Sequence, residues 1–346
     1  MLAWFIIIFS GLSFGITLGP QERWSSVSDP LIMSSSFETR FYALPMEGMV
    51  KYQTRFWSGD YWALNKGNID RRWNAQGSML SVRPPTREQV RKMSSSELAQ
   101  LSPAEKFDLL NGLYHYPLKT EVRKISNPNA RDWEGICHGW APASMNHNEP
   151  TPKTLLNPDG VSIPFGSSDI KALLSYFYAY PYYVENTRQV GRRCYGGRTN
   201  PDQDCKQDLN AGAFHIVLTN KIALENSGLI ADMDRWQQVW NHPIIGYETK
   251  IQGEQRGGRS GAAPGTVRTI RVKTNITYLD ETGNSWERVR PKTQTQSLEY
   301  FLELNAQGTI IGGEWRFLAR PDFLWLKEAP YVFTGMFYRL KELLND

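Results

Sequence analysis

Cys137 is the residue in this sequence best placed for nucleophilic chemistry. It stands in Asp132-Trp-Glu-Gly-Ile-Cys-His-Gly-Trp-Ala-Pro-Ala-Ser, where a turn at Gly135 precedes a predicted helix. The unpaired N–H groups and the positive dipole at a helix N-terminus favour a thiolate, so the pattern predicts a lowered thiol pKa. The same N–H groups can receive a developing oxyanion. The alternative role for Cys137 is that of a small buried hydrophobe.

A cysteine nucleophile needs a base, and His215 is the predicted one. It lies in Asn210-Ala-Gly-Ala-Phe-His-Ile-Val-Leu-Thr, and residues 213–219 are interpreted as a buried strand. The other four histidines fit less well: His138 adjoins Cys137 and points elsewhere on a helix, His115 and His147 fit a surface, and His242 fits a Trp-Asn-His-Pro turn. The alternative role for His215 is that of a hydrogen-bonded core histidine.

Two aspartates could orient this histidine. Asp232 and Asp234 end the apolar strand predicted at residues 228–233, and alternation puts both on one face. A carboxylate there would fix the imidazole tautomer and stabilise its charged form. Asp234 is preferred and Asp232 stays open. The order Cys…His…Asp is typical of papain-type and transglutaminase-type centres.

Composition excludes several function classes. Lys and Arg total 39 against 35 Asp and Glu, without a dense basic block, so no nucleic-acid partner is expected. The chain lacks the usual zinc, calcium-loop and serine-hydrolase motifs. We therefore expect no cofactor and no metal. With 40% hydrophobic and 12% aromatic residues, the chain can bury a sizeable core.

The N-terminus predicts export. Residues 1–19 carry no charge and begin with an apolar run, which favours a cleaved signal peptide over an uncleaved anchor. No later run is apolar enough to span a membrane, so a secreted or periplasmic protein is expected, without membrane contact after cleavage. A disulfide between Cys194 and Cys205 would leave Cys137 as the unpaired one of three cysteines.

The elements that must position these residues are of both kinds. Capping boxes at Ser94 and Ser102 predict helices within residues 86–115, and a further helix is expected at 168–180. Residues 267–279 alternate as a strand, and residues 298–311 read as a hairpin. These patterns predict an α+β fold in which the cysteine helix packs on an antiparallel sheet bearing His and Asp. The expected divisions are an irregular and helical N-terminal region (20–125), a catalytic core (126–252) and a β-rich C-terminal region (253–346).

One peptide adds a family resemblance. Val239-Trp-Asn-His-Pro-Ile-Ile-Gly-Tyr resembles the surface peptide of oomycete transglutaminase elicitors, a Val-Trp-Asn-Gln-Pro-Val-x-Gly-Phe pattern in which His242 here replaces Gln and Ile244 replaces Val. The segment from Trp133 to Ala143 is similar to the nucleophile segment of that family. The resemblance implies a secreted, calcium-independent protein-glutamine γ-glutamyltransferase with Cys137 as nucleophile, His215 as base, and Asp234 or Asp232 as orienting residue.

The expected reaction joins a glutamine side chain to a primary amine through a thioester on Cys137. Its substrates would be proteins or peptides with Gln and Lys, bound in a cleft walled by Trp133, Trp140 and Trp240. The oxyanion donors would be the Cys137 N–H and an upstream group, with Asn129, Arg131 and Trp133 as candidates. Two alternatives stay open: a cysteine peptidase or amidase acting on cell-wall or protein substrates, and a non-catalytic, elicitor-like binding protein.

Overall fold

The computed structural model describes residues 24–51, 55–75, 83–182, 187–193, 208–235, 238–330 and 332–345. The predicted signal segment and the Cys194–Cys205 pair lie outside these residues. In the part of the chain that the structure describes, none of the helices is both long enough and apolar enough to cross a membrane.

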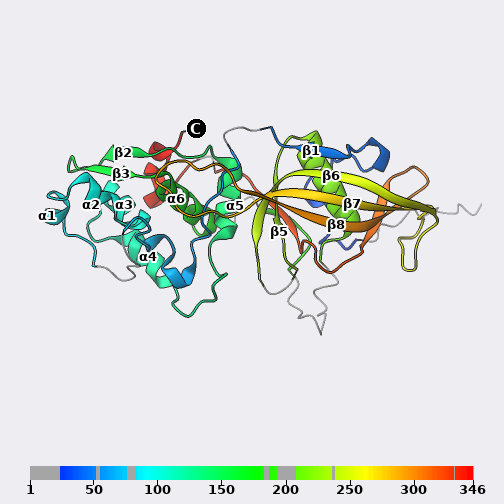
Figure 1. The fold of residues 1–346 in the computed structure, drawn as a ribbon, viewed down its shortest axis with the longest axis horizontal. Helices are drawn as coiled ribbons and strands as arrows, with labels where there is room; N and C mark the ends of the chain where they lie inside the picture. Colours follow the sequence, from blue (N-terminus) through cyan, green and yellow to red (C-terminus); the bar gives the residue numbers. More distant parts are fainter. Residues whose placement is uncertain are drawn as a thin grey trace, which may run out of the picture.

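The molecule is elongated, with a helical part at one end and a large sheet at the other (Figure 1). Helix α5 lies between the two. The helices are α1 (Arg87–Val90), α2 (Ser95–Ala99), α3 (Pro103–Leu110), α4 (Pro117–Ile125), α5 (Cys137–Asn146), α6 (Ser167–Ala179) and α7 (Ala211–Thr219). Shorter helical turns cover Pro30–Ile32, Phe41–Ala43, Leu64–Lys66, Asn68–Asp70, Asn220–Leu224 and Gly335–Leu343.

The large sheet has the strand order β4-β10-β5-β6-β7-β8-β9, with β1 pairing to β6, and the neighbouring strands pair antiparallel. A separate hairpin, β2-β3, lies in the helical part. The strands are β1 (Glu47–Met49), β2 (Lys153–Leu156), β3 (Ser162–Phe165), β4 (Thr187–Val190), β5 (Leu229–Asp232), β6 (Asn241–Arg256), β7 (Arg268–Leu279), β8 (Thr293–Leu304), β9 (Ile310–Trp315) and β10 (Leu324–Lys327).

Most of the local predictions are confirmed. The hydroxyl of Ser94 accepts a hydrogen bond from the N–H of Glu97, and that of Ser102 accepts one from the N–H of Glu105. The carboxylate of each glutamate accepts a bond from the N–H of its serine, which completes two capping boxes. The alternating run forms β7, and the predicted hairpin forms β8 and β9. The expected mixture of helices with an antiparallel sheet is therefore present. The expected boundary at 252/253 falls inside β6, which runs on to Arg256.

The strand predicted at residues 213–219 is wrong, because this segment forms α7. The side chain of Asn210 caps the helix by accepting a hydrogen bond from the N–H of Gly212, and all nine residues of α7 are buried. A short run that is apolar on every side carries no periodicity, so it fits a buried strand and a buried helix equally well. The N-cap residue is the signal that distinguishes the two.

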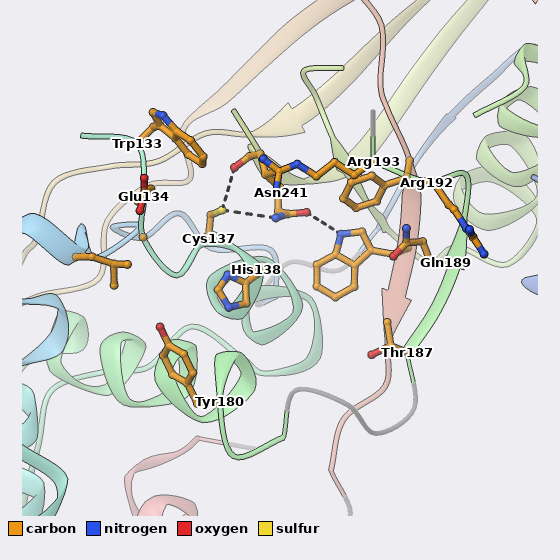
Figure 2. A pocket seen from close by; sticks show the side chains of 15 residues that line it. Trp133, Glu134, Cys137, His138, Tyr180, Thr187, Gln189, Arg192, Arg193 and Asn241 are labelled. Carbon is orange, nitrogen blue, oxygen red and sulfur yellow. Dashed lines mark hydrogen bonds between the residues drawn. The ribbon is translucent and has the colours of Figure 1, made fainter. Parts of the chain in front are cut away.

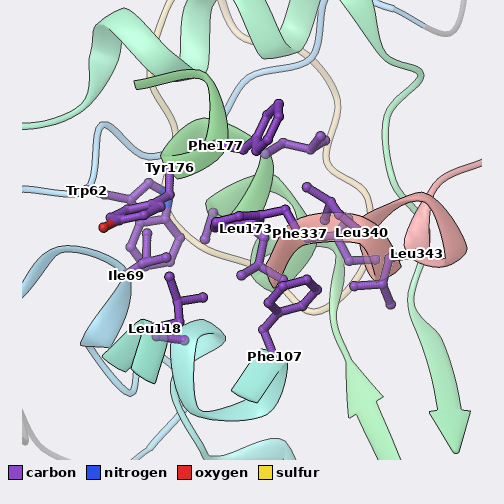
Figure 3. Packing of buried hydrophobic residues seen from close by; sticks show 14 of the residues in the cluster. Trp62, Ile69, Phe107, Leu118, Leu173, Tyr176, Phe177, Phe337, Leu340 and Leu343 are labelled. Carbon is purple, nitrogen blue, oxygen red and sulfur yellow. The ribbon is translucent and has the colours of Figure 1, made fainter. Parts of the chain in front are cut away.

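Two large hydrophobic clusters fill the molecule. In the helical cluster, Phe107 of α3, Leu118 of α4 and Leu173 of α6 converge with Phe337 near the C-terminus (Figure 3). The sheet cluster packs α7 against the inner faces of β5 to β9 and includes Phe214. Cys137 belongs to the helical cluster, and α5 also contacts β6 of the sheet. The nucleophile candidate thus lies where the two parts meet.

Candidate active site

The N-terminus of α5 is fixed by close backbone packing. The N–H of Ile136 donates a 2.7 Å hydrogen bond to the carbonyl of Tyr61. A Cβ on Gly135 would lie 2.4 Å from that same oxygen, and a Cβ on Gly139 would lie 1.9 Å from the carbonyl of Ser175 on α6. Both positions therefore require glycine, and the two contacts hold the first turn of α5 from both sides.

Cys137 is the first residue of α5 and faces a cavity of about 840 Å³. In Figure 2 it lies between Trp133 and Glu134 on one side and Asn241 on the other. The remaining described residues of the wall come from α5, α6, β4, β6, β10 and the segments beside them: Leu64, Gly135, His138, Tyr180, Thr187, Gln189, Arg192, Arg193, Val239, Phe323 and Trp325. The cavity is large enough for a side chain of a peptide substrate.

The sulfur of Cys137 has two neighbours, one at the start of β6 and one in the segment just before it. Its thiol donates to the carbonyl of Val239 at 3.6 Å, and the side-chain NH₂ of Asn241 donates to the sulfur at 3.6 Å. The amide oxygen of Asn241 in turn accepts a 2.8 Å hydrogen bond from the indole of Trp325. Among the described residues, the backbone N–H of Cys137 has no hydrogen-bond partner.

The predicted lowering of the Cys137 pKa is wrong. Burial raises the pKa of this thiol to about 11, and the hydrogen bonds from Asn241 do not offset the loss of solvation. Negative charge on Glu281 and Asp232 adds to the rise. The thiol is thus protonated at neutral pH, and an attack by the sulfur requires a base to take its proton.

The structure does not bring His215 to Cys137. His215 is fully buried in α7, within the sheet cluster, and its Nδ1 is hydrogen-bonded to the hydroxyl of Tyr300 at 2.8 Å. The ring also packs beside Phe41, and burial lowers its pKa to about 3. The assignment of His215 as base is corrected accordingly: it is a neutral core histidine, because the segment that carries it is a buried helix.

The two aspartates do not orient His215 either, since Tyr300 holds that ring. Asp232 is buried at the end of β5, and its Oδ1 accepts hydrogen bonds from the backbone N–H groups of Trp240 and Asp234. It therefore ties together the two ends of the segment that leads to β6. Burial raises the pKa of Asp232 to about 8. Asp234 is half-buried and lies beyond the end of β5.

The three tryptophans predicted to bind substrate differ in position. Trp133 lines the cavity. Trp140 does not: it is fully buried, and its indole donates to the carbonyl of Trp57 at 3.3 Å. Trp240 is half-buried and packs between Tyr61 and His242, outside the cavity wall. Of these three tryptophans, Trp133 is therefore the one that can contact a substrate in this cavity directly.

His242 is the functional candidate that the sequence analysis set aside. It is the second residue of β6, 5% exposed, and its Nδ1–H donates a 2.7 Å hydrogen bond to the carbonyl of Leu279. This bond fixes the tautomer and leaves the Nε2 lone pair facing Glu281, whose Oε1 is 3.9 Å away. Burial lowers the pKa of His242, and burial together with Asp280 raises the pKa of Glu281 to about 7.

His242 is linked to the nucleophile through α5. Its ring packs edge-on against Trp140, with ring centres 5.8 Å apart, and Trp140 lies one turn after Cys137. The preceding residue, Asn241, contacts the sulfur directly. Glu281 lies close enough to both groups to act on the Cys137 pKa and to face the imidazole. The sequence signal that could have identified this pair is a histidine, His242, at the start of a long strand, followed by two acids, Asp280 and Glu281, at the end of the next strand.

The same cluster holds ligand types that suit a divalent cation. One ligand atom from each of His242, Asp280 and Glu281 lies within 4.8 Å of the others. Asp280 is already paired with the ammonium of Lys292 at 2.6 Å, and the His242 Nδ1 is bound to a carbonyl. Two of the three ligand side chains thus already have a partner within the protein.

The comparisons with known proteins identify the family and the fold. Residues 124–338, more than half of the chain, match the family model described as transglutaminase elicitor. The chain belongs to the transglutaminase elicitor family. The matched segment of this family member includes α5, β6 and β10, so it contains Cys137, Asn241 and Trp325.

A solved structure shares the fold of this family member. It is the crystal structure of the GP42 transglutaminase from Phytophthora sojae, with a TM-score of 0.64 and 23% sequence identity over 90% of this chain and 94% of that chain. At this identity the likeness shows a common fold. A search of curated proteins finds no match.

Proposed function

We propose that this protein is a secreted protein-glutamine γ-glutamyltransferase that forms isopeptide bonds through a thioester on Cys137. The observation that supports it most is the Cys137 sulfur at the first turn of a helix, on the wall of an 840 Å³ cavity. Membership of the transglutaminase elicitor family supports the same reaction class. Secretion rests on the predicted signal peptide at residues 1–19.

The first half-reaction acylates the enzyme. The Cys137 sulfur attacks the side-chain carbonyl carbon of a glutamine while its proton passes to a base. A C–S bond forms, the C–N bond breaks, and the base returns the proton to the leaving nitrogen, which departs as ammonia. In the second half, a primary amine attacks the thioester, the C–S bond breaks, and the amine proton returns to sulfur.

The base is His242 in this proposal. Its Nδ1 is held by the carbonyl of Leu279, and its Nε2 faces Glu281, which can stabilise the imidazolium that forms during proton transfer. The order along the chain is still Cys, His, acid, but the histidine is His242 and the acids are Asp280 and Glu281. Cys137 is the first residue of α5, His242 is the second residue of β6, and Asp280 and Glu281 directly follow β7.

His138 is the competing histidine, because it lines the cavity beside Cys137. Its ring packs edge-on against Tyr180, and burial together with the charge of Lys327 lowers its pKa to about 4. Adjacent helix residues also point in different directions. The proposal favours His242, because its Nε2 faces the carboxylate of Glu281 at 3.9 Å.

The cavity wall fits an acyl-transfer site. Trp133, Phe323 and Trp325 contribute apolar surface that keeps water from the thioester, so that an amine competes for it. Arg192, Arg193 and Glu134 place charges of both signs around the cavity, suited to a peptide backbone and its neighbouring side chains. We expect the reaction to proceed without calcium.

The decisive experiment measures ammonia release from a glutamine-containing peptide with and without an added primary amine. A transglutaminase releases ammonia in step with incorporation of the amine, and Cys137→Ala abolishes both. Ammonia release that does not depend on the added amine would instead indicate an amidase, and cleavage of the peptide backbone would indicate a peptidase.

A purely structural Cys137 would give a different result. In that case Cys137→Ala and the natural protein would behave alike in every assay, and the elicitor-like binding role would be the remaining one.

A further inference from the structure

We propose that the side-chain amide of Asn241 is the second donor of the oxyanion site, together with the backbone N–H of Cys137, and that Trp325 sets its orientation. The inference deepens the proposed acyl transfer and rests on Cys137 being acylated. It replaces the upstream candidates Asn129, Arg131 and Trp133 with a residue that lies on β6, downstream of the nucleophile.

The position of Asn241 supports this role. Its Nδ2 is 3.6 Å from the Cys137 sulfur, it lines the same cavity, and the residue is 3% exposed. A carbonyl carbon attacked by the sulfur must lie within bonding distance of it. Its oxygen is then within reach of donors that surround the sulfur, and Asn241 is the described side chain that donates to it.

The orientation of the amide follows from the chemistry of its other neighbour. The indole N–H of Trp325 is only a donor, so the atom of Asn241 that it contacts at 2.8 Å must be the oxygen. The NH₂ group must therefore face Cys137 and the cavity. Of its two hydrogens, one points at the sulfur and the second is available for a substrate oxygen.

The second donor lies at the start of α5. The N–H of Cys137 has no hydrogen-bond partner among the described residues, as expected for the first residue of a helix. It adds the positive end of the helix dipole to the amide of Asn241. The two donors come from different elements and flank one sulfur, which is the arrangement that a tetrahedral intermediate requires.

The upstream candidates lie less favourably. The guanidinium of Arg131 packs over the Trp133 ring, 6.0 Å from its centre, and Arg131 is exposed. Asn129 is also exposed, and its N–H donates to the side chain of Asn127 within its own turn. Trp133 lines the cavity, but no hydrogen bond connects it to the sulfur in the described structure.

The chemical step is balanced without a further reactant. As the sulfur adds to the carbonyl carbon, the π electrons of the C=O bond move to the oxygen, and the thiol proton goes to the base. Asn241 and the Cys137 N–H stabilise the negative oxygen by hydrogen bonds alone and exchange no proton. When the intermediate collapses, the C=O bond re-forms and the leaving group departs with the proton from the base.

The test uses p-nitrophenyl acetate with the full chain, because acylation by an ester passes through the same oxyanion but does not require a transglutaminase substrate. The natural protein is expected to release a burst of p-nitrophenol, and Cys137→Ala to release none. Asn241→Ala should lower the burst rate roughly 100-fold or more, with little change in the apparent KM. Asn241→Asp should do the same, because a negative charge would face the oxyanion.

Trp325→Phe tests the positioning role. It keeps the ring and removes the indole donor, so the rate should fall by less than in Asn241→Ala while the KM is kept. Trp315→Phe is the matched control, since it removes an indole donor to the carbonyl of Leu209, outside this cavity. The rate of alkylation of Cys137 should fall far less than the burst rate in Asn241→Ala and Trp325→Phe, because alkylation forms no oxyanion.

The burst and alkylation rates together decide whether Asn241 is an oxyanion donor. An undiminished burst in either Asn241 variant, or an equal fall in alkylation and burst rates, would overturn the inference, as would the lack of any burst from the natural protein. If Asn241→Ala does not fold, as judged by circular dichroism, Asn241→Asp and Trp325→Phe decide. A normal burst without amine-dependent ammonia release would refute the transglutaminase proposal and leave the Asn241 result valid.

Discussion

The indole of Trp325 donates a 2.8 Å hydrogen bond to the side-chain oxygen of Asn241 and thereby turns the NH₂ of that amide towards Cys137. The three residues come from β10, β6 and α5, which are far apart in the sequence. Because the amide that contacts the sulfur comes from β6 and is itself held from β10, the chemistry of the sulfur depends on how the helical part and the sheet are assembled.

Replacing Cys137 by alanine should abolish acyl transfer and leave the fold intact. The side chain is small and 5% exposed, so its loss should cost about 1 kcal/mol of stability. Ammonia release measures the loss of activity, and chemical unfolding of the same preparation measures the change in stability. Retained activity in this variant would exclude Cys137 as nucleophile.

The pH dependence of alkylation should reveal the raised thiol pKa. Iodoacetamide reacts with the thiolate, and burial disfavours the charged form, so the pKa of about 11 predicts a rate that keeps rising from pH 7 to pH 10. The rate constant for labelling at Cys137, measured by mass spectrometry, checks this. A rate that levels off below pH 8 would show instead that a positively charged neighbour stabilises the thiolate.

The two histidines near Cys137 should differ in their effect on acyl transfer. His242→Gln removes the proposed base and should lower the rate roughly 100-fold or more. His138→Gln removes a ring that packs on Tyr180, so it should leave most of the rate. Single-turnover acylation of both variants gives the comparison, and the reverse order would transfer the role of base to His138.

Asp232→Asn should stabilise the protein at pH 8 and have a smaller effect at pH 5. A carboxyl whose pKa rises to about 8 on folding holds its proton in the folded state, so stability is lost as pH rises from about 4 towards 8. Asparagine keeps the oxygen that accepts from the Trp240 and Asp234 N–H groups and cannot ionise. Urea unfolding at both pH values should show a gain on the order of a few kcal/mol at pH 8. A gain that is equal at both pH values would point to packing as its cause.

Gly139→Ala should destabilise the contact between α5 and α6. The added Cβ would lie 1.9 Å from the carbonyl of Ser175, so one helix must move, at a cost of about 2 kcal/mol or more. Because α5 begins at Cys137, acyl transfer should fall as well. Thermal unfolding measures the loss of stability, and an activity assay measures the fall in acyl transfer. Ala143→Gly on the same helix is a control that removes a side chain without creating a clash.

The local sequence around Cys137 was sufficient to predict its helix. A turn glycine, a cysteine and a run of small residues are short-range signals, and so are the two capping boxes before it. Strands β7 and β8 were predictable for the same reason, because their alternation is visible within a dozen residues. The family resemblance, based on the segments around Cys137 and Val239, is confirmed.

The partner of the nucleophile could not be predicted in this way. His215 was selected because it lies in an apolar run, yet burial on all sides is what makes that run a core helix rather than an active-site strand. His242 precedes a proline, which favoured a turn, but it pairs with Ala231 within β6. Its proximity to Glu281 depends on the pairing of β6 with β7, a long-range contact that no local pattern contains.

The thiol pKa was mispredicted because the sign of a shift depends on competing terms. A helix N-terminus lowers the pKa of a cysteine, and sequence can locate such a terminus. Burial raises it, and the degree of burial at Cys137 comes from packing against Val239 and Asn241, about a hundred residues later. In this protein burial outweighs the hydrogen bonds that Asn241 donates to the sulfur, and the pKa rises.

The location of Cys137 between two separately packed clusters has a consequence for biosynthesis. The ribosome completes α5 long before it reaches Asn241, and Trp325 follows only near the end of the chain. A chain that is still being translated therefore carries Cys137 without Asn241, which contacts its sulfur, and without Trp325, which orients that amide. In the proposed transglutaminase, the complete set of groups around the sulfur would thus form only when translation is nearly finished.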